Sequence, residues 1–271
     1  MRKGLVAAVF PFCGDGDNDG VPVFRMKDFE NLGRIWSGNS SAVHKISNKE
    51  TRDIYALKTV RTSSCARSEI DALRLFDHEN VVKMVAKSGD DPSGPFHIVL
   101  EHMPWDLRRA FESEEHGLKI RKNKRKILSQ ILEGLKHIHS RGIEHRDIYP
   151  RNILIDPETM AVKICDFGLC AHNPSERNFD LLDVASIIIY LHSGRYYPVY
   201  GFLEYYYTNL FSDKMETVVS NNGVDLLKKM RNITPAKDLL DHPFFSEDPE
   251  LDRCIALGKK EMVRRELQVR R

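Results

Sequence analysis

The sequence predicts an α+β protein with two lobes: an N-terminal lobe with an antiparallel sheet and one helix, and a mainly helical C-terminal lobe. Residues 43–47, 54–60 and 96–103 have the apolar patterns that are typical of strands. Residues 68–76 place their apolar side chains on one helical face. After residue 104 the pattern changes, because residues 123–142 carry apolar side chains about one helical turn apart.

The C-terminal part contains three further apolar segments with helical character, at residues 181–194, 200–211 and 224–230. Gly142 is a plausible terminator of the helix predicted before it. The shift from strand patterns to helix patterns predicts a boundary near residue 103. We therefore divide the chain into an N-terminal extension (1–22), an N-lobe (23–102), a C-lobe (103–246) and a basic C-terminal tail (247–271).

The composition is that of an ordinary soluble globular protein, with 41% hydrophobic and 30% charged residues. The formal net charge of the 271 residues is +2, so direct binding to nucleic acid is not expected. No apolar run is long enough to predict a membrane span. The five cysteines are scattered and form no C-x-x-C pair, which favours an intracellular protein of the cytoplasm, the nucleus or both.

The stretch EHRDIYPRNILID, residues 144–156, combines a carboxylate with an amide five positions later. Asp147 is the candidate that accepts the proton of a reacting hydroxyl, because that chemistry needs a carboxylate within hydrogen-bonding distance. Asp166 follows the apolar stretch AVKIC, 19 positions after Asp147. Amide and carboxylate oxygens are the ligands that Mg²⁺ prefers, so Asn152 and Asp166 are the candidate metal ligands.

A candidate phosphate-binding amine lies in the N-lobe. Lys58 ends the strand pattern Tyr-Ala-Leu-Lys, and Glu69 opens the helix pattern that follows. A lysine on a rigid strand, fixed by a carboxylate, holds phosphates in phosphoryl transfer enzymes. Lys58 alone is weak evidence, but Lys58 together with Glu69 predicts an ion pair with this role.

These motifs, in this order, resemble the eukaryotic-type protein kinase family over residues 29–246, and ITPAKDLLDHPFF (233–245) resembles the end of the family's C-lobe. The resemblance implies ATP and Mg²⁺ as cofactors, Asp147, Lys58 and Asn152 as catalytic residues, and Asn152 and Asp166 as metal ligands. It also implies that Leu100 is the gatekeeper and that Asp183 braces the catalytic loop. The nucleotide-binding residues that it implies are Ile35, Gly38, Val43, Ala56, Lys58, Glu69, Glu101, Met103 and Leu154.

Two stretches are similar to the cyclin-dependent kinase group. MPWDLRRAF resembles the Asp-Leu step after that group's hinge, and SSCARSEIDALRLFDHENVVKM resembles its cyclin-facing helix. This similarity implies a serine/threonine kinase with a protein substrate, possible roles in the cell cycle or transcription, and a cyclin-like or other regulatory partner at the helix that carries Glu69.

The sequence departs from the family pattern at three places. In IWSGNSSAV, residues 35–43, only Gly38 remains of the three glycines that let backbone N–H groups approach phosphates. Tyr149 stands where serine/threonine kinases have a lysine beside the γ-phosphate. Only 17 positions separate Asp166 from Asp183, and the Ala-Pro-Glu anchor is missing from them.

Three functions are therefore compatible with the sequence. The first is an active serine/threonine protein kinase that transfers the γ-phosphate of ATP to protein hydroxyls. The second is a weak or inactive pseudokinase that acts as a nucleotide-binding scaffold or regulator. The third is a small-molecule kinase of the same fold, in which a short activation segment is normal.

Overall fold

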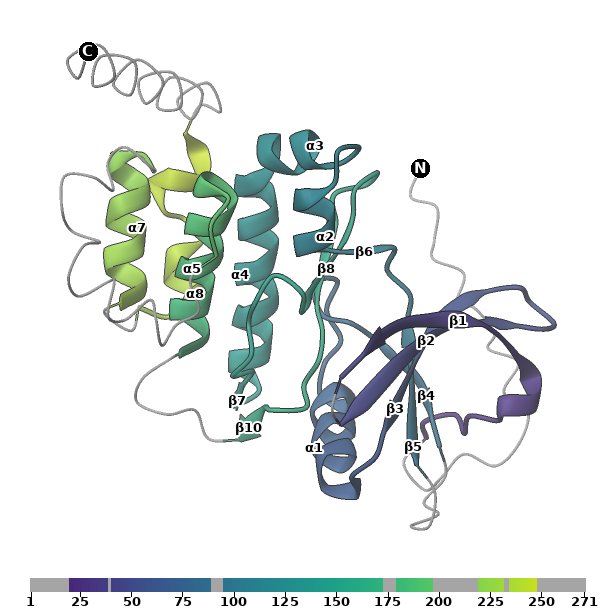
Figure 1. The fold of residues 1–271 in the computed structure, drawn as a ribbon. Coiled ribbons are helices and arrows are strands. Elements are labelled where there is room, and N and C mark those ends of the chain that lie inside the picture. Colours follow the sequence, from purple (N-terminus) through teal and green to yellow (C-terminus); the bar gives the residue numbers. More distant parts are fainter. Residues whose placement is uncertain are drawn as a thin grey trace, which may run out of the picture. The chain divides into compact units, whose positions relative to one another are not determined.

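The computed structural model describes residues 20–38, 40–88, 95–172, 179–196, 219–231 and 234–247. By their internal contacts these residues divide into unit 1, within Met1–Ile70 and Lys83–His102, and unit 2, within Asp71–Val82 and Met103–Arg271. The combination of an antiparallel sheet in unit 1 with helices in unit 2 confirms the predicted α+β, bilobal class (Figure 1). The helix predicted over 200–211 lies outside the described residues, as do residues 1–19 and 248–271.

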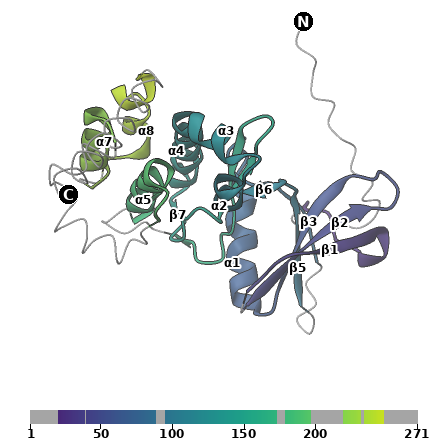
Figure 2. The ribbon, with the colours of Figure 1, turned by 45° about the horizontal axis from the view of Figure 1, so that its top comes forward.

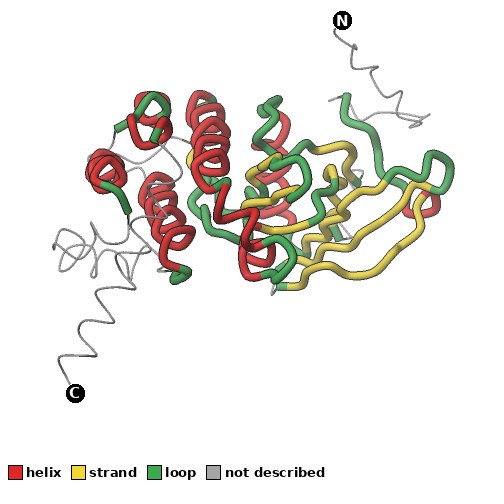
Figure 3. Tube along the Cα trace, turned by 90° about the horizontal axis from the view of Figure 1, so that it is seen from above, coloured by secondary structure: helices red, strands yellow, loops and turns green. Residues whose placement is uncertain are grey.

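Unit 1 is a five-stranded antiparallel sheet in the order β1-β2-β3-β5-β4. Figure 3 shows these strands in yellow as one continuous, twisted layer. A short 3-10 helix precedes β1, and α1 follows β3. The bounds are η1 Met26–Asp28, β1 Phe29–Ser37, β2 Ser41–Asn48, β3 Ile54–Val60, α1 Ser63–Arg74, β4 Met84–Lys87 and β5 Phe96–Glu101.

Local sequence explains the turn between β2 and β3. The side chain of Asn48 accepts the backbone N–H groups of Glu50 and Thr51 at 2.8 and 3.0 Å, which closes the polar turn. The predicted strand over 54–60 matches β3, and the strand predicted over 43–47 lies inside β2. The helix predicted over 68–76 is α1, which begins earlier, at Ser63, and ends at Arg74. The earlier start was not predicted, because the segment before Arg67 lacks apolar periodicity.

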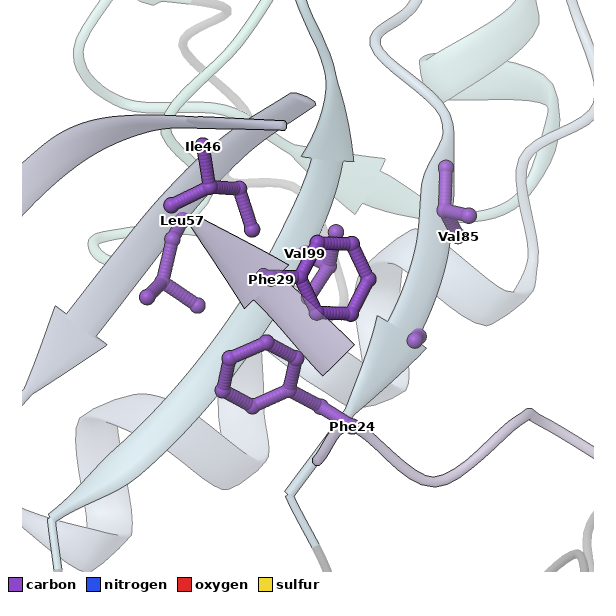
Figure 4. Close-up of a cluster of buried hydrophobic side chains, with 7 residues drawn as sticks. Phe24, Phe29, Ile46, Leu57, Val85 and Val99 are labelled. Atoms are coloured by element: carbon purple, nitrogen blue, oxygen red, sulfur yellow. The ribbon is translucent and has the colours of Figure 1, made fainter. Parts of the chain in front are cut away.

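The core of unit 1 lies on one face of the sheet and is covered by the segment that precedes and opens β1 (Figure 4). The rings of Phe24 and Phe29 lie 5.3 Å apart, and Tyr55 packs on the same cluster. Side chains alternate between the faces of a strand, so Leu57 enters this core while Lys58 points to the opposite face. The buried members of the cluster are Phe24, Phe29, Ile46, Leu57, Val85, Ala86 and Val99.

Unit 2 is built around two long helices, α4 and α5, which contact each other (Figure 2). Two small sheets lie beside them: β7 pairs with β10, and β6, β8 and β9 form the other. The bounds are β6 Trp105–Asp106, α2 Leu107–Glu112, α3 Gly117–Lys122, α4 Lys124–Ser140, β7 Ile143–Glu144, β8 Ile153–Asp156, β9 Ala161–Ile164, β10 Ala171–His172, α5 Phe179–Ser193, α7 Asn221–Arg231, α8 Ala236–Leu239 and η2 Pro243–Ser246.

The two long helices of unit 2 follow from their apolar patterns. In α4, Ile127, Ile131, Leu135 and Ile138 are fully buried, as their spacing of about one turn predicts. Gly142 has φ +70°, the left-handed conformation that commonly ends a helix. Helix α5 is apolar on nearly all sides and is buried from residue 184 to residue 191, which makes it the central helix of this unit.

We expect the apolar cluster of unit 1 to dominate its stability. Phe29→Ala should lower the free energy of unfolding by about 3–5 kcal/mol, because it removes a buried aromatic ring and leaves a cavity. Leu32→Ala, in the same strand but 45% exposed, is the matched control and should cost less than about 1 kcal/mol. Urea denaturation followed by circular dichroism measures both changes, and equal losses would contradict this description of the core.

Candidate active site

The candidate phosphate-binding amine is fixed by a buried ion pair in unit 1. Lys58 Nζ lies 2.7 Å from both carboxylate oxygens of Glu69, and the two side chains are 6% and 2% exposed. Strand β3 supplies the lysine and helix α1 the glutamate. Removing either charge from water alone is costly, and close pairing of the two charges offsets that cost. This geometry therefore holds the ammonium in one place. The predicted pair is therefore present.

The register of the sheet shows which predicted nucleotide-binding residues share the Lys58 face. Val43 lies directly opposite Lys58, and directly opposed residues of an antiparallel pair point to the same face. Ala56, two positions before Lys58, lies on that face as well, opposite Leu100 on β5. This face therefore combines a fixed ammonium with a small apolar surface.

The predicted phosphate-covering turn has an unusual packing. An ideal Cβ built on Gly38 would lie 2.3 Å from Cη2 of the Trp36 indole. The Trp36 indole thus fills the space beside Gly38 into which a side chain would project, and the backbone approach of Gly38 to phosphates stays a prediction. Ile35, also predicted as a nucleotide contact, is 46% exposed and lies at an irregularity of the β1–β2 register.

The predicted hinge residues lie at the end of β5. Glu101 is the last residue of that strand and lies opposite Tyr55. Its carboxylate accepts the backbone N–H of Lys83 at 2.7 Å, and its own N–H donates to the Lys83 carbonyl at 3.0 Å. Met103 follows the last residue of unit 1 and is partly buried. The adenine contacts of Glu101 and Met103 stay predictions.

The predicted catalytic loop of unit 2 is closed by hydrogen bonds between its own members. Asn152 Nδ2 donates to the Asp147 carbonyl at 2.9 Å and to Asp147 Oδ2 at 2.8 Å. The backbone N–H of Asp147 donates to Nδ1 of His145 at 3.2 Å, and the other ring nitrogen lies 3.0 Å from the Cys165 carbonyl. Asp147 and Asn152, placed together by sequence reasoning, are in direct contact.

The carboxylate that braces this loop is Asp180, which corrects the assignment of that role to Asp183. Asp180, fully buried in the first turn of α5, accepts the backbone N–H groups of His145 at 2.8 Å and Arg146 at 2.7 Å. Nε2 of His139 lies 2.8 Å from the same carboxylate. Both acids lie on one face of the helix, so the sequence alone could not decide between them.

The electrostatics of Asp180 support this role. Burial alone would raise its pKa, but hydrogen bonds from His139 and His145 hold the pKa of Asp180 below its usual value. Burial, in contrast, lowers the pKa of the His145 imidazole, so the ring at the centre of the loop is neutral. An ionised Asp180 therefore stabilises the loop by accepting from buried donors that would otherwise lack a partner.

Two residues of the site have a left-handed backbone that is uncommon without glycine. Arg146 has φ +67° and Asp166 has φ +68°. Such conformations cost about 1–3 kcal/mol each and persist only where surrounding contacts hold them. At Arg146 the contact is Asp180, and beside Asp166 the buried Phe167 ring lies 4.8 Å from His145 and 4.9 Å from Phe76. Both left-handed residues adjoin the candidate functional groups, because Arg146 directly precedes Asp147 and Asp166 is itself a candidate metal ligand.

Asn152 and Asp166 fit the donor set that magnesium prefers. The backbone N–H of Cys165 donates to the Asn152 carbonyl at 2.9 Å, which places Asp166 next to the loop. The hydrogen bonds from Asn152 to Asp147 leave its amide oxygen as the ligand atom. Among the described residues no group of three His, Cys, Asp or Glu side chains could hold a metal. Magnesium commonly takes one or two protein oxygens, with phosphates and water completing its shell.

Tyr149 and Tyr196 add two phenols around Asp147. Burial raises the pKa of Tyr149, and the negative charges of Asp147 and Asp166 raise it further. Burial likewise raises the pKa of Tyr196, with Asp183 and Asp147 as its main charged neighbours. Tyr149 is therefore a neutral donor at physiological pH. Tyr196 was missed by sequence reasoning, because nothing in its local sequence indicates that it returns to the loop.

A short link replaces a long segment between Asp166 and α5. Strand β10 pairs with β7, and α5 begins at Phe179, 13 positions after Asp166. The Glu144 carboxylate on β7 accepts the backbone N–H of Phe179 at 3.3 Å and lies 3.0 Å from Arg146 Nε. Glu144 thus connects the catalytic loop to the start of α5. Leu154, predicted to contact the nucleotide, is partly buried in β8.

The family described as protein kinase domain matches residues 29–189. Two probable serine/threonine-protein kinases of Arabidopsis thaliana are 35% and 37% identical to the chain, over 58% and 62% of its length and 22% and 31% of their own. Mitogen-activated protein kinase 4 of Homo sapiens is 35% identical over 54% of this chain and 26% of its own. The chain spans less than a third of each of these relatives.

We expect the two acids of α5 to differ in their contribution to stability. Asp180→Ala removes the acceptor of two buried backbone N–H groups, and unsatisfied buried donors cost about 1–3 kcal/mol each. The free energy of unfolding at neutral pH should therefore fall by about 3–5 kcal/mol. Asp183→Ala should cost less than Asp180→Ala, because the Asp183 carboxyl interacts with one backbone amide, that of Ile148. Asp71→Ala, at an exposed helix position, is the control and should cost less than about 1 kcal/mol. A larger loss for Asp183→Ala in urea denaturation would restore the original assignment.

Proposed function

The chain belongs to the protein kinase family, and we propose on that basis that it is a serine/threonine kinase that transfers the γ-phosphate of ATP to protein hydroxyls. The observation that carries this proposal is the hydrogen-bonded pair of Asp147 and Asn152, held on a loop that the buried Asp180 anchors. A scaffold has no structural need for that pair beside a second candidate metal ligand, Asp166.

We assign the cofactors ATP and Mg²⁺ to the groups that fit them. Lys58, fixed by Glu69, would hold the α- and β-phosphates, and the Val43 and Ala56 side chains would form an apolar surface for the base. Asn152 and Asp166 would hold the metal through their side-chain oxygens. Bound magnesium neutralises phosphate charge.

Asp147 is assigned as the group that accepts the proton of the acceptor hydroxyl. One of its carboxylate oxygens, Oδ2, is held by Asn152 at 2.8 Å, which orients the carboxyl group. A carboxylate positioned in this way takes a proton in the transition state and contributes roughly 10²–10⁴-fold to such reactions. His145 and Arg146 orient the loop and do not touch the reacting atoms in this proposal.

We expect the rate of γ-phosphate transfer to be low. In the related kinases a lysine ammonium at the position of Tyr149 stabilises the developing charge, whereas a phenol with a raised pKa is neutral. Loss of one such electrostatic contact costs about 2.7–4 kcal/mol, or roughly a hundred- to thousandfold in rate. The packing of Trp36 on Gly38 is a second hindrance, because it fills space at the phosphate-covering turn.

The second candidate is a pseudokinase that binds nucleotide without turnover and acts as a scaffold or regulator. The packing of Trp36 and the short link between Asp166 and α5 favour it. That short link is also the one feature in favour of a small-molecule kinase. Phosphorylation of protein hydroxyls distinguishes the first candidate from the other two.

A cell-cycle or transcription role and a cyclin-like partner at α1 stay proposals taken from the resemblance. In α1, Ala66, Glu69 and Ile70 are buried, and the exposed positions include Arg67, Asp71 and Arg74. An apolar partner surface is therefore not favoured over residues 66–74. An intracellular location, in the cytoplasm or nucleus, stays a proposal taken from the scattered cysteines of the sequence, which form no C-x-x-C pair. Within the described residues, no helix has the length and apolarity to cross a membrane.

The proposed activity predicts opposite effects of two substitutions in the catalytic loop. Asp147→Asn should lower γ-phosphate transfer from Mg–ATP to a serine/threonine peptide mixture by at least about a hundredfold, because the proton acceptor is lost. Tyr149→Lys should raise it by roughly ten- to a hundredfold, because it restores a cation beside the γ-phosphate. Radiolabel transfer measures both. Equal, near-zero transfer by the native chain and by both variants would favour the scaffold.

Nucleotide binding should depend on the buried ammonium. Lys58→Met should weaken the binding of a fluorescent ATP analogue by at least about tenfold, because the phosphates lose their fixed cation. The double variant Lys58→Met, Glu69→Gln tests the same loss without leaving an unpaired buried carboxylate. Lys49→Met, at an exposed turn position, is the control. Unchanged affinity in both Lys58 variants would remove the role assigned to Lys58.

A further inference from the structure

Two imidazole rings of unit 2 stack on each other outside the predicted catalytic loop. His137 lies in α4 and His78 in the segment between α1 and β4. Their ring centroids are 5.0 Å apart, and the ring planes are inclined by only 26°. Both side chains are partly exposed, so protons of the solvent reach them. Neither ring has a role in the proposed function, and histidine is the side chain that changes its charge near neutral pH.

The ring of His78 keeps its contacts only as a neutral imidazole. Its Nδ1 accepts the backbone N–H of Asn80 at 3.1 Å, and a protonated Nδ1 has no lone pair with which to accept. Asn80 is buried, and its side chain donates to the Val162 carbonyl at 2.9 Å and to Gln130 Oε1 at 3.2 Å. These bonds fix the turn to β9 and α4, so the turn holds the His78 ring beside His137.

The ring of His137 is suited to the neutral state for a different reason. Its Nε2 is buried and has no hydrogen-bond partner among the described residues. Protonation places a charged N–H where nothing accepts it, and an unpaired buried charge is costly. Burial is accordingly the main reason why the pKa of His137 is lowered, and repulsion from His78 and Arg141 lowers this pKa further.

The charged side chains around the stacked pair do not offset this cost. Arg141 follows His137 by one helical turn, and Lys163 of β9 donates to the Glu79 carbonyl at 2.9 Å, so both bring positive charge to this region. Asp77 favours a proton on His137, but its effect is smaller than those of His78 and Arg141. The acids Asp77 and Glu79 are both exposed, and water screens exposed charges.

Ring contacts connect the stacked pair to the predicted site. The ring of Phe76 lies 6.0 Å from that of His137, edge to face, and 4.9 Å from that of Phe167. Phe167 directly follows Asp166, and its ring lies 4.8 Å from His145. Protein interiors are close-packed, so a ring that leaves its place removes support from its neighbours. A change in the stack is therefore transmitted to Phe167 through Phe76.

We propose that His78 and His137 form an acid-sensitive lock in unit 2. While both rings are neutral, they stack and hold Phe76 against Phe167. When either ring takes up a proton, the stack opens and this contact loosens. The loosening follows from the contacts of the rings and needs no kinase activity. Its consequence for phosphate transfer, through the adjacent Asp166, rests on the proposed function.

The direction of the pH effect follows from the state of His137. Its pKa is lowered in the folded protein, whereas in the unfolded chain a histidine has a pKa of about 6.5. Below pH 6.5 the unfolded chain therefore binds more protons than the folded chain, and the stability that depends on the neutral ring is lost as the pH falls. This stability is fully present above that value. The lock is closed at neutral pH and opens in acid.

The first experiment observes the lock without using activity. Phe76 is replaced by 4-fluorophenylalanine in the full chain, and its ¹⁹F resonance is followed from pH 7.5 to pH 5. The test variant is His78→Asn, His137→Phe. An asparagine side chain accepts the N–H two residues on, and a phenylalanine keeps an aromatic ring in the stack, so both contacts remain without a titratable ring. The resonance should shift in acid in the native chain and stay constant in the double variant.

Two results of this experiment overturn the proposal. One is a resonance that stays constant in the native chain. The other is an equal shift in the double variant, because the responding group is then a different one, such as His145. His172→Phe, a matched change at an exposed position, should keep the native titration. If the double variant does not fold, each single variant should give a smaller change in the ¹⁹F shift than the native chain.

The second experiment measures phosphate transfer from Mg–ATP at pH 7.5 and pH 5.5. The ratio of the two rates is taken within each protein, so a change in basal activity cancels. The loss in acid should be larger in the native chain than in the double variant, by up to about tenfold per pH unit, the limit for one titrating group. His172→Phe should keep the native ratio. Equal ratios in an active native chain and its double variant contradict the connection between the lock and the site.

The two measurements separate this proposal from the proposed function. A chain that transfers no phosphate at any pH, but shows a ¹⁹F shift that the double variant removes, contradicts the kinase activity and supports the lock. An active chain whose ¹⁹F resonance does not respond to acid contradicts the lock and supports the kinase activity.

Discussion

The structure of the candidate site depends on one buried carboxylate, that of Asp180. It accepts the backbone N–H groups of His145 and Arg146 and contacts His139, all at 2.7–2.8 Å. Hydrogen bonds to an ionised group in a low-dielectric interior are stronger than their counterparts in water, and losing such an acceptor is costly. This carboxylate therefore stabilises the left-handed backbone at Arg146, and the direction of Asp147 follows from it. The apolar helix α5 carries Asp180 into the core.

The link between Asp166 and α5 is short, and the loop is held by local hydrogen bonds. Protein kinases have an activation segment in this place, whereas here α5 starts 13 positions after Asp166. Bonds within the loop and to the start of α5 supply local support. Glu144 joins Arg146 to the N–H of Phe179, and Asn152 joins Asp147 to the strand that leads to Asp166. The candidate groups for metal and proton chemistry are thus held by these local bonds, and in unit 1 the Trp36 indole fills the space beside Gly38.

Sequence patterns predicted the parts of this fold in which periodicity reports burial. Strand β3 and the buried positions of α4 follow directly from alternation and helical spacing, and the pairing of Lys58 with Glu69 follows from motif order. The start of α1 could not be predicted, because residues 63–67 have no apolar repeat. Asp180 and Asp183 share a helix face, so only the structure shows which carboxylate accepts the N–H groups of His145 and Arg146. The contact between Trp36 and Gly38 depends on a side-chain rotamer, and the position of Tyr196 depends on a chain reversal; neither leaves a local signal.

The central claim is that the Asp180 carboxylate holds the predicted catalytic loop in the observed geometry. Native-state amide hydrogen exchange at Arg146 tests it most directly, because that N–H donates to Asp180 although the Arg146 side chain is exposed. The account predicts that the Arg146 amide exchanges as slowly as the buried amides of α4, and that Asp180→Asn speeds its exchange selectively. An Arg146 amide that exchanges as fast as an exposed loop amide in the native chain would contradict the claim.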